Sequence, residues 1–341
     1  MPRPLVPGIY APIQIFLLPS SEPTPETKRL DTATIAHHAV RLVRAGVAGI
    51  VTNGSNGEAS LLDPEERATA TRVTRTALDK EGYTDVPVVS GASASSVNST
   101  VGLCRDAAEA GADAVLLLAP AFVGGGMGTD GLERYFVLVA DESPLPVLIY
   151  NYPAAAGGLD LDSDILERLA EHPNIVGTKF TCGNVGKMAR VVGKLRERVV
   201  SNTILRPERT GRCQNGNVAS PYFAFTGVAD SIVSAVGAVG GTGGIVGAAN
   251  VFPRTCVEIY RLIVEGRWQE AREAQFNLAK ADWSLTKRGV PGFKAVLSHY
   301  HGYGGVPRAP MGTLTSEASK ELFDEIDQFM RYEEQLVDCR Q

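Results

Sequence analysis

The sequence predicts an α/β fold, namely a parallel (β/α)8 TIM barrel with a C-terminal helical extension. The first observation is that short apolar segments alternate eight times with amphipathic helical segments, about thirty residues apart, which is typical of such a barrel. The second is the length of 341 residues, enough for one large barrel or for two ordinary domains. The third is that three helical segments follow the eighth unit. The alternation by itself also allows a doubly wound sheet.

The strands are predicted from apolar runs that are bounded by Gly, Pro, Asn or Asp. The run that ends at Lys179 is typical, because its interior is too apolar for a solvated face and His172-Pro173 precedes it. The eight expected strands are residues 8–16, 47–52, 86–90, 112–118, 145–150, 174–179, 221–226 and 243–247.

The helices are predicted from apolar residues at helical spacing and from their start signals. Asp63-Pro64 is the strongest of these signals, with an N-cap acid and a proline at the first helical position. The expected barrel helices begin near 31 and 63 and then cover 97–110, 131–141, 161–171, 185–198, 230–239 and 253–265. Helices at 268–285, 291–300 and 316–334 form the extension, so we expect a barrel over 1–265 and packed helices over 266–341. Polar segments at 19–28 and 201–219 are expected to be loops.

Composition excludes several classes of function. The net charge of −5 and the pI near 5.7 argue against nucleic acid as a partner. No apolar run is long enough to span a membrane. The five cysteines are far apart and form no CxxC pair, which fits neither a disulfide framework nor a zinc site. The N-terminus resembles neither a signal nor a transit peptide, so we expect a cytoplasmic protein.

Lys179 is the first candidate for chemistry, because active sites of (β/α)8 barrels lie at the C-terminal ends of the strands. A lysine near apolar walls is more easily deprotonated, since desolvation disfavours the ammonium, and a neutral amine can attack a ketone to form a Schiff base. The alternative is a lysine that extends to the surface from a strand end.

Two further strand ends carry candidate residues. After the second strand, Ser55 and Asn56 lie in a glycine-containing turn that could bind a small anion such as a carboxylate, or could be an ordinary connection. Tyr150 closes the fifth strand. It could be a packing residue, but next to a Schiff-base lysine it would be a natural proton shuttle.

The ordered set of motifs resembles a known family. Gly54-Ser-Asn-Gly-Glu58, Tyr150-Asn-Tyr-Pro153 and Ile175-Val-Gly-Thr-Lys179 are similar to the dihydrodipicolinate synthase and N-acetylneuraminate lyase family of class I aldolases, over about residues 8–314. Further segments resemble the branch of 4-hydroxy-2-oxoglutarate and 2-keto-3-deoxy sugar acid aldolases. They are Glu171 to Gly177, Gly237 to Gly241, Ala248 to Val251, Gly289 to Lys294 and Arg308 to Pro310.

The resemblance implies a role for each matching residue. Lys179 would form the Schiff base and Tyr150 would be the catalytic tyrosine, with Ser55 in the proton relay. Ser55 and Asn56 would hold the carboxylate of pyruvate. Gly227 and Ile245 would line the pocket. The family usually assembles as tetramers, so we expect a homo-oligomer, either a tetramer or a dimer.

Among the positions that depart from the family pattern, two bear on substrate binding. Phe122 stands where the family's relay often has a tyrosine, so the relay is either shorter or completed by water, or the reaction differs. Ala155 stands where dihydrodipicolinate synthases have an arginine for their second carboxylated substrate. This absence argues against lysine biosynthesis and somewhat favours an uncharged aldehyde fragment.

The expected function is therefore that of a class I aldolase that needs no cofactor and no metal. It would cleave a 4-hydroxy-2-oxo acid or a 2-keto-3-deoxy sugar acid to pyruvate and an aldehyde. One alternative uses the same enamine for hydratase-aldolase or condensation chemistry. Another is a non-catalytic barrel that binds a 2-oxo acid. A metal-dependent aldolase is disfavoured, because no His, Asp and Glu cluster falls at the strand ends.

Overall fold

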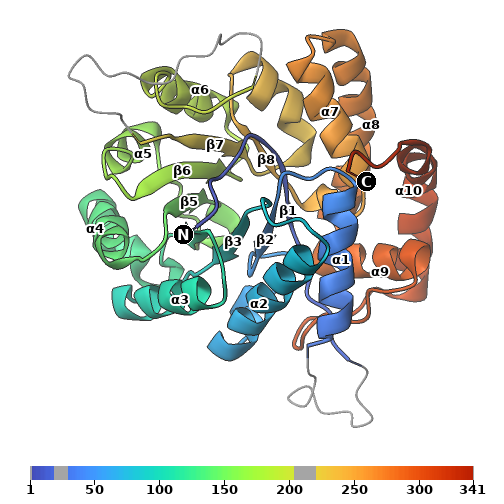
Figure 1. Cartoon of the computed structure of the whole chain (residues 1–341), viewed down its shortest axis with the longest axis horizontal. Helices are drawn as coiled ribbons and strands as arrows, with labels where there is room; N and C mark the ends of the chain where they lie inside the picture. Colours follow the sequence, from blue (N-terminus) through green and yellow to red (C-terminus); the bar gives the residue numbers. More distant parts are fainter. Residues whose placement is uncertain (1, 19–29, 203–219, 341) are drawn as a thin grey trace.

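Eight parallel strands close into a barrel in the order of the sequence, and a ring of helices surrounds them (Figure 1). The structure is a computed structural model that describes residues 2–18, 30–202 and 220–340. The strands are β1 (Gly8–Pro12), β2 (Gly49–Thr52), β3 (Val88–Gly91), β4 (Ala114–Leu118), β5 (Val147–Asn151), β6 (Ile175–Phe180), β7 (Phe223–Thr226) and β8 (Gly243–Ile245). The barrel closes where β1 pairs with β8, with Ile9 opposite Gly244. The predicted (β/α)8 barrel is confirmed, and the doubly wound alternative is wrong.

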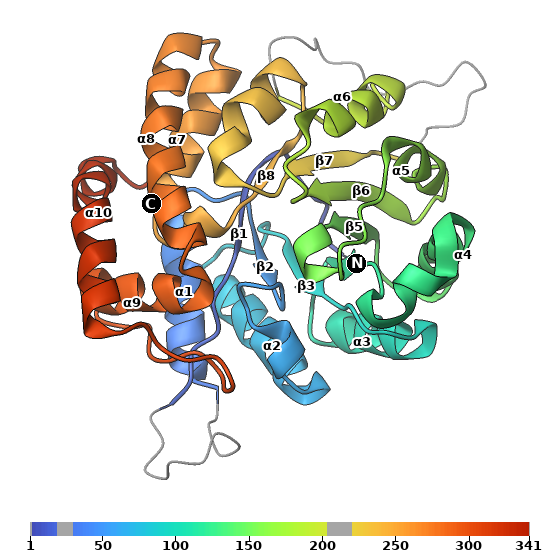
Figure 2. The same cartoon turned by 180° about the vertical axis from the view of Figure 1, so that it is seen from behind.

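The helices around the barrel are α1 (Thr32–Arg44), α2 (Pro64–Lys80), α3 (Val97–Glu109), α4 (Ala121–Glu142), α5 (Ser163–Leu169), α6 (Val185–Lys194) and α7 (Pro253–Val264). Three more helices complete the chain: α8 (Trp268–Thr286), α9 (Gly289–His301) and α10 (Ser316–Gln335). Short helical turns lie between them: η2 (Ala59–Leu61), η3 (Pro153–Ala155), η4 (Ala229–Ser231), η5 (Val233–Ala238) and η6 (Gly247–Asn250). Seen from behind, α9 and α10 lie outside the ring, beside α1 and α8 (Figure 2).

Several elements differ from the expected ranges. The helix expected at 131–141 begins ten residues earlier, because α4 joins two helical segments across Gly128, whose φ of 64° breaks the helix. The helix expected at 230–239 is a 3-10 turn followed by a π-helix. The first strand ends at Pro12 rather than at 16, although the Ile13 amide still donates a hydrogen bond to the Val51 carbonyl over 2.9 Å. The expected loop at 19–28, and all but the first two residues of the one at 201–219, lie outside the described residues.

The apolar core has an inner and an outer part. Inside the barrel, side chains from the strands pack together, including Val89, Leu116, Leu148 and Phe225. Outside it, the helices pack on the strands, and residues of α8, α9 and α10 share a core cluster with β1 and α1. Burial of these side chains is the main favourable contribution to folding. The expected boundary at residue 265, between the barrel and the C-terminal helices, stays a prediction.

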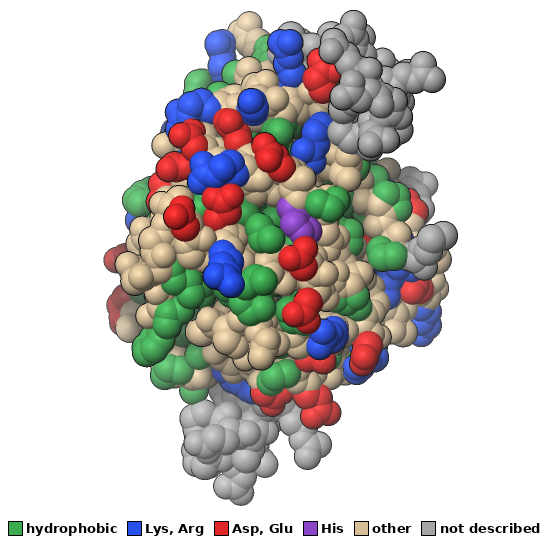
Figure 3. Space-filling model, turned by 90° about the vertical axis from the view of Figure 1, so that its left-hand side faces the viewer, with side chains coloured by type: hydrophobic (Ala, Val, Ile, Leu, Met, Phe, Trp, Pro, Cys, Tyr) green, Lys and Arg blue, Asp and Glu red, His purple; other side chains and the backbone are tan. Residues whose placement is uncertain are grey.

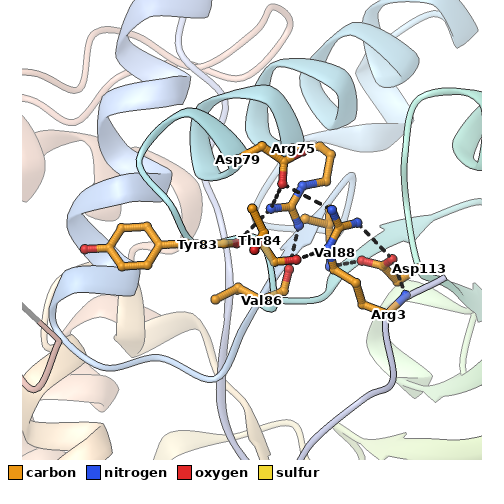
Figure 4. A network of polar contacts seen from close by, with 8 residues as sticks. All are labelled: Arg3, Arg75, Asp79, Tyr83, Thr84, Val86, Val88 and Asp113. Carbon is orange, nitrogen blue, oxygen red and sulfur yellow. Dashed lines mark hydrogen bonds and ion pairs between the residues drawn. The ribbon is translucent and has the colours of Figure 1, made fainter. Parts of the chain in front are cut away.

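A polar network ties the N-terminal segment to the N-terminal ends of the strands (Figure 4). The Arg3 amide donates to Asp113 over 2.7 Å, and the same carboxylate accepts a hydrogen bond from the Val88 amide at the start of β3. Asp79 pairs with both Arg3 and Arg75. This network lies beside the starts of β3 and β4, at the end of the barrel opposite to the one where the candidate residues lie.

The surface carries no dominant charge on the face that shows α3, α4 and α5. Acidic and basic side chains alternate there with hydrophobic ones (Figure 3). Within residues 2–18, 30–202 and 220–340, no helix is long and apolar enough to cross a membrane.

Candidate active site

Lys179 lies on β6, one residue before the strand ends, and its side chain is buried at 3% exposure. Desolvation lowers the pKa of its amine from 10.5 to about 7. In the described part of the chain, no carboxylate forms an ion pair with this amine to offset that loss. Lys179 is therefore held in the barrel and does not reach the surface, and a large fraction of the amine is neutral at physiological pH.

Tyr150 lies directly beside this lysine, because the register of β5 on β6 pairs the two residues. The Lys179 Nζ atom is 4.0 Å from the centre of the Tyr150 ring. Burial raises the pKa of Tyr150 to about 12, although the hydrogen bond with Ser55 and the nearby Thr181 hydroxyl act in the opposite direction. The phenol is therefore protonated at neutral pH and can donate a proton to a group bound at the amine.

Ser55 completes the contact from the turn after β2. Its Oγ atom lies 2.8 Å from the Tyr150 hydroxyl. The turn begins and ends in left-handed backbone conformations, at Asn53 with φ of 56° and Glu58 with φ of 53°. Such conformations are uncommon outside glycine and need support from the surroundings.

Asn53 and Glu58 receive that support from buried side-chain contacts. The Asn53 Nδ2 atom donates to the Arg67 carbonyl over 2.9 Å and lies close to two buried hydroxyls. Glu58 forms a buried ion pair with Lys294 of α9 over 2.6 Å. It also accepts a hydrogen bond from the Arg308 amide over 2.5 Å. The position of Ser55 thus depends on residues from the C-terminal extension.

A cavity of about 170 Å³ opens next to these residues. Ser55, Tyr150 and Ala155 belong to its lining. The other lining residues are Asn53, Gly54, Ala59, Ser60, Arg67, Gly91, Ser93, Leu116 and Leu118. The volume is below the usual range of ligand pockets and fits a small substrate.

The other predicted residues lie around the same end of the barrel. Gly227 follows β7, and a Cβ atom there would lie only 1.7 Å from the Thr181 Oγ1 atom, so a glycine allows this approach. Ile245 ends β8 and belongs to the same interior cluster as Tyr150. The Asn56 amide lies against Gly247, just beyond β8, so it projects from the β2 turn towards the last strand.

Phe122 is placed differently from the other predicted residues. It lies at the start of α4 with 91% of its surface exposed and is not among the residues that line the cavity. Within the described residues of a single chain, Phe122 is therefore not placed to bind the substrate. Ala155, by contrast, lines the cavity, and its small side chain leaves space where an arginine would fill it.

Sequence reasoning missed two residues of this site. Thr181 follows Lys179 by two positions and approaches the Tyr150 hydroxyl. Arg67 lines the cavity from α2, and no local sequence pattern distinguishes it from the other arginines of that helix. In the described part of the chain, no three His, Cys, Asp or Glu side chains gather in a way that could hold a metal ion.

Comparison with known proteins identifies relatives over the whole length. The sequence profile of the "Dihydrodipicolinate synthetase family" matches residues 16–202 and 214–329. A protein of Aspergillus niger named "L-threo-3-deoxy-hexylosonate aldolase" is 43% identical over 336 residues, which cover 98% of each chain. A protein of Emericella nidulans named "Probable 4-hydroxy-2-oxoglutarate aldolase, mitochondrial" is 42% identical, again over 98% of each chain.

A solved structure agrees with these sequences. A dihydrodipicolinate synthase family protein from Coccidioides immitis is 30% identical, covers 98% of this chain and 99% of its own, and superimposes with a TM-score of 0.80. The profile and the relatives each cover nearly all of the chain. The chain therefore belongs to the dihydrodipicolinate synthetase family.

Proposed function

We propose that this protein is a Schiff-base aldolase that cleaves a 4-hydroxy-2-oxo acid or a 2-keto-3-deoxy sugar acid to pyruvate and an aldehyde. The observation that carries the proposal is the group of three side chains formed by Lys179, Tyr150 and Ser55. The Lys179 amine has a pKa of about 7 and lies 4.0 Å from the centre of the Tyr150 ring. The Tyr150 hydroxyl in turn contacts Ser55. The aldolase names of full-length relatives support the same class of reaction.

The first half of the reaction forms the Schiff base. The neutral Lys179 amine attacks the C2 carbonyl of the substrate and gives a carbinolamine. The Tyr150 hydroxyl donates its proton to the departing oxygen, so that water leaves and an iminium forms. Tyr150 is then a phenolate, and its hydrogen bond with Ser55 stabilises the charge.

The second half breaks the carbon–carbon bond. The Tyr150 phenolate takes the proton of the C4 hydroxyl, the C3–C4 electron pair moves toward the iminium, and an aldehyde separates from the enamine. The Tyr150 hydroxyl, which now holds the former C4 hydroxyl proton, protonates the enamine at C3. Water adds to the resulting iminium and returns a proton to the Tyr150 phenolate, and collapse of the carbinolamine releases pyruvate and the neutral amine. This sequence returns Lys179 and Tyr150 to their starting forms, so no cofactor is required.

Borohydride trapping tests the first step. Wild-type protein incubated with pyruvate and borohydride should carry one reduced pyruvyl group by intact mass, and Lys179→Ala should carry none. Lys194→Ala is the matched control, because Lys194 is an exposed lysine at the end of α6. No adduct on the wild type would refute the aldolase mechanism and would favour a non-catalytic 2-oxo-acid-binding barrel.

Product analysis separates the aldolase from its enzymatic alternatives. An aldolase releases equal amounts of pyruvate and free aldehyde from the 4-hydroxy-2-oxo acid. Hydratase-aldolase or condensation chemistry instead gives an unsaturated or lengthened product from the same enamine. The saturated, oxygen-bearing substrates in the names of the relatives favour the simple cleavage.

We also propose that the protein is a homo-oligomer, a tetramer or a dimer. Phe122 is 91% exposed, and Val123 and Met127 on the same helix are also exposed. Apolar side chains grouped in this way commonly mark an interface. Light scattering after size exclusion should give an oligomeric mass, and Phe122→Glu should reduce it. A monomeric wild type would contradict this proposal.

A cytoplasmic location is likewise a proposal. It is supported by the free thiols of Cys104, Cys182, Cys256 and Cys339, which suit a reducing compartment. The name of the Emericella nidulans relative includes the word mitochondrial. Cell fractionation with markers for both compartments would decide between the two locations.

A further inference from the structure

Arg67 is the single charged residue among the described residues that line the cavity beside Tyr150 and Ser55. It belongs to the first turns of α2, just after the Asp63 cap. The Asn53 side chain anchors its backbone through the Arg67 carbonyl. The guanidinium therefore projects from a fixed point on the wall of the cavity.

Much of the hydrogen-bonding capacity of this guanidinium is unused. One of its nitrogens, Nη1, donates to the Ser93 carbonyl over a long distance of 3.3 Å. The Nε atom is buried and has no hydrogen-bond partner among the described residues. No carboxylate of the described chain lies within ion-pair distance of Arg67, whereas Arg75 on the same helix pairs with Asp79. A buried donor without a partner is costly, and a ligand that accepts its hydrogen bond removes that cost.

Desolvation lowers the pKa of Arg67, although an arginine remains charged at physiological pH. The charge is thus partly buried, and the residues that the structure describes supply no counter-charge to it. The other polar residues of the lining are uncharged, namely Asn53, Ser55, Ser60, Ser93 and Tyr150. Ala155 contributes only a methyl group. Among the described lining residues, the cavity therefore has one charged donor, and its chemistry suits oxygen acceptors of a substrate.

We propose that Arg67 binds the oxygen atoms at the distal end of the substrate, on the fragment that leaves as the aldehyde. This inference rests on the proposed function, since the amine of Lys179 fixes the position of the 2-oxo group. The acceptor is either a carboxylate, as in 4-hydroxy-2-oxoglutarate, or the hydroxyls of a 2-keto-3-deoxy sugar acid. Arg67 would thus supply the cation that Ala155 does not.

A matched set of substrates tests the inference. 4-Hydroxy-2-oxoglutarate and 4-hydroxy-2-oxopentanoate differ only at C5, which is a carboxylate in the first and a methyl group in the second. A 2-keto-3-deoxyhexonate carries hydroxyls at the same end. The Arg67→Met variant should lose about 10- to 100-fold in kcat/KM with the oxygen-bearing substrate that Arg67 holds. It should lose less than about twofold with 4-hydroxy-2-oxopentanoate.

The two oxygen-bearing substrates show whether Arg67 binds a carboxylate or hydroxyl groups. A greater loss with 4-hydroxy-2-oxoglutarate assigns Arg67 to a carboxylate, and a greater loss with the hexonate assigns it to hydroxyls. Arg72→Met is the control, because Arg72 is exposed on the same helix, and all three substrates should be unaffected by it. An equal loss with all three substrates, or no loss with any, would overturn the inference.

Trapping keeps this test separate from the proposed function. Arg67→Met should form the reduced pyruvyl adduct at the wild-type rate, because pyruvate has no distal fragment. A wild-type adduct with no substrate-dependent loss would refute the role of Arg67 alone. Absence of the adduct in the wild type would refute the proposed function, and the role of Arg67 with it.

Discussion

Lys294→Met should destabilise the protein strongly, because it removes one partner of a buried ion pair. Lys294 and Glu58 are exposed at 1% and 0% of their side chains, and Nζ and Oε1 are 2.6 Å apart. The substitution leaves the carboxylate without a counter-charge in the interior. The loss of one partner from such a pair typically costs about 3–5 kcal/mol of unfolding free energy.

The structure places this change in the lower half of that range. The Arg308 amide still donates to the second oxygen of Glu58 over 2.5 Å, so the carboxylate keeps one hydrogen bond. Methionine fills most of the volume of the lysine stem, which limits the formation of a cavity. The hydrogen bond from Lys294 to the Val306 carbonyl is lost as well. We therefore expect a loss of about 3 kcal/mol.

The same substitution should affect pyruvate binding. Glu58 ends the turn that carries Ser55 and Asn56, and its left-handed conformation is held by the ion pair. Without that support the turn is free to relax, so more pyruvate should be needed for half-maximal borohydride trapping. The adduct should still form at saturating pyruvate, because Lys179 does not contact Lys294 in the structure described.

Urea denaturation measures the predicted loss. Lys320→Met is the control, since Lys320 also lies 2.6 Å from a carboxylate, but on the surface of α10. Exposed pairs contribute less than about 1 kcal/mol. The double variant Glu58→Gln with Lys294→Met should be more stable than the sum of the single losses indicates, because it removes both charges. Equal losses for Lys294→Met and Lys320→Met, or strict additivity in the double variant, would refute the argument.

Three further predictions concern the site and its support. The rate of borohydride trapping should rise with pH through about 7 and then level off, because the Lys179 pKa is lowered to that value and only the neutral amine reacts. A rise centred near the ordinary lysine pKa of 10.5 would contradict burial of the amine. Tyr150→Phe should lower kcat for cleavage by about 10²- to 10⁴-fold while slow adduct formation remains, and near wild-type turnover would exclude Tyr150 as the proton shuttle. Gly91→Ala should lower the thermal unfolding temperature, because the new Cβ would lie 1.9 Å from the Asn53 carbonyl oxygen. The control is Gly102→Ala in α3, where a new Cβ would meet no other atom, so this change should be neutral or stabilising by up to about 1 kcal/mol. A similar result for Gly91→Ala would disprove the steric conflict at Gly91.

Local patterns were enough to predict the barrel and its family. Strands such as 174–179 were visible because their apolar runs are bounded by turn residues, and Asp63 with Pro64 marked the start of α2. The ordered motifs predicted the family, which the full-length relatives confirmed. The helix expected at 131–141 was too short, because the break at Gly128 concealed a second helical segment in front of it.

The chemistry of the site required the tertiary structure. The sequence alone placed Lys179 and Tyr150 at strand ends, because strand boundaries follow from local composition. Their contact depends on the register of β5 on β6, and the lowered pKa of Lys179 depends on walls contributed by other strands. Desolvation is a property of packing, which no local pattern encodes.

The same reason explains the residues that sequence reasoning missed. The partners of Glu58 lie more than two hundred positions away, at Lys294 and Arg308. Arg67 is one of several arginines on α2, and only the fold directs it to the cavity. The sequence by itself thus determined the alternation of strands and helices, the family and the reactive residue types. Only the tertiary structure decided which side chains meet, which charges are buried and which donor is left for a substrate, because these depend on contacts between segments distant in the chain.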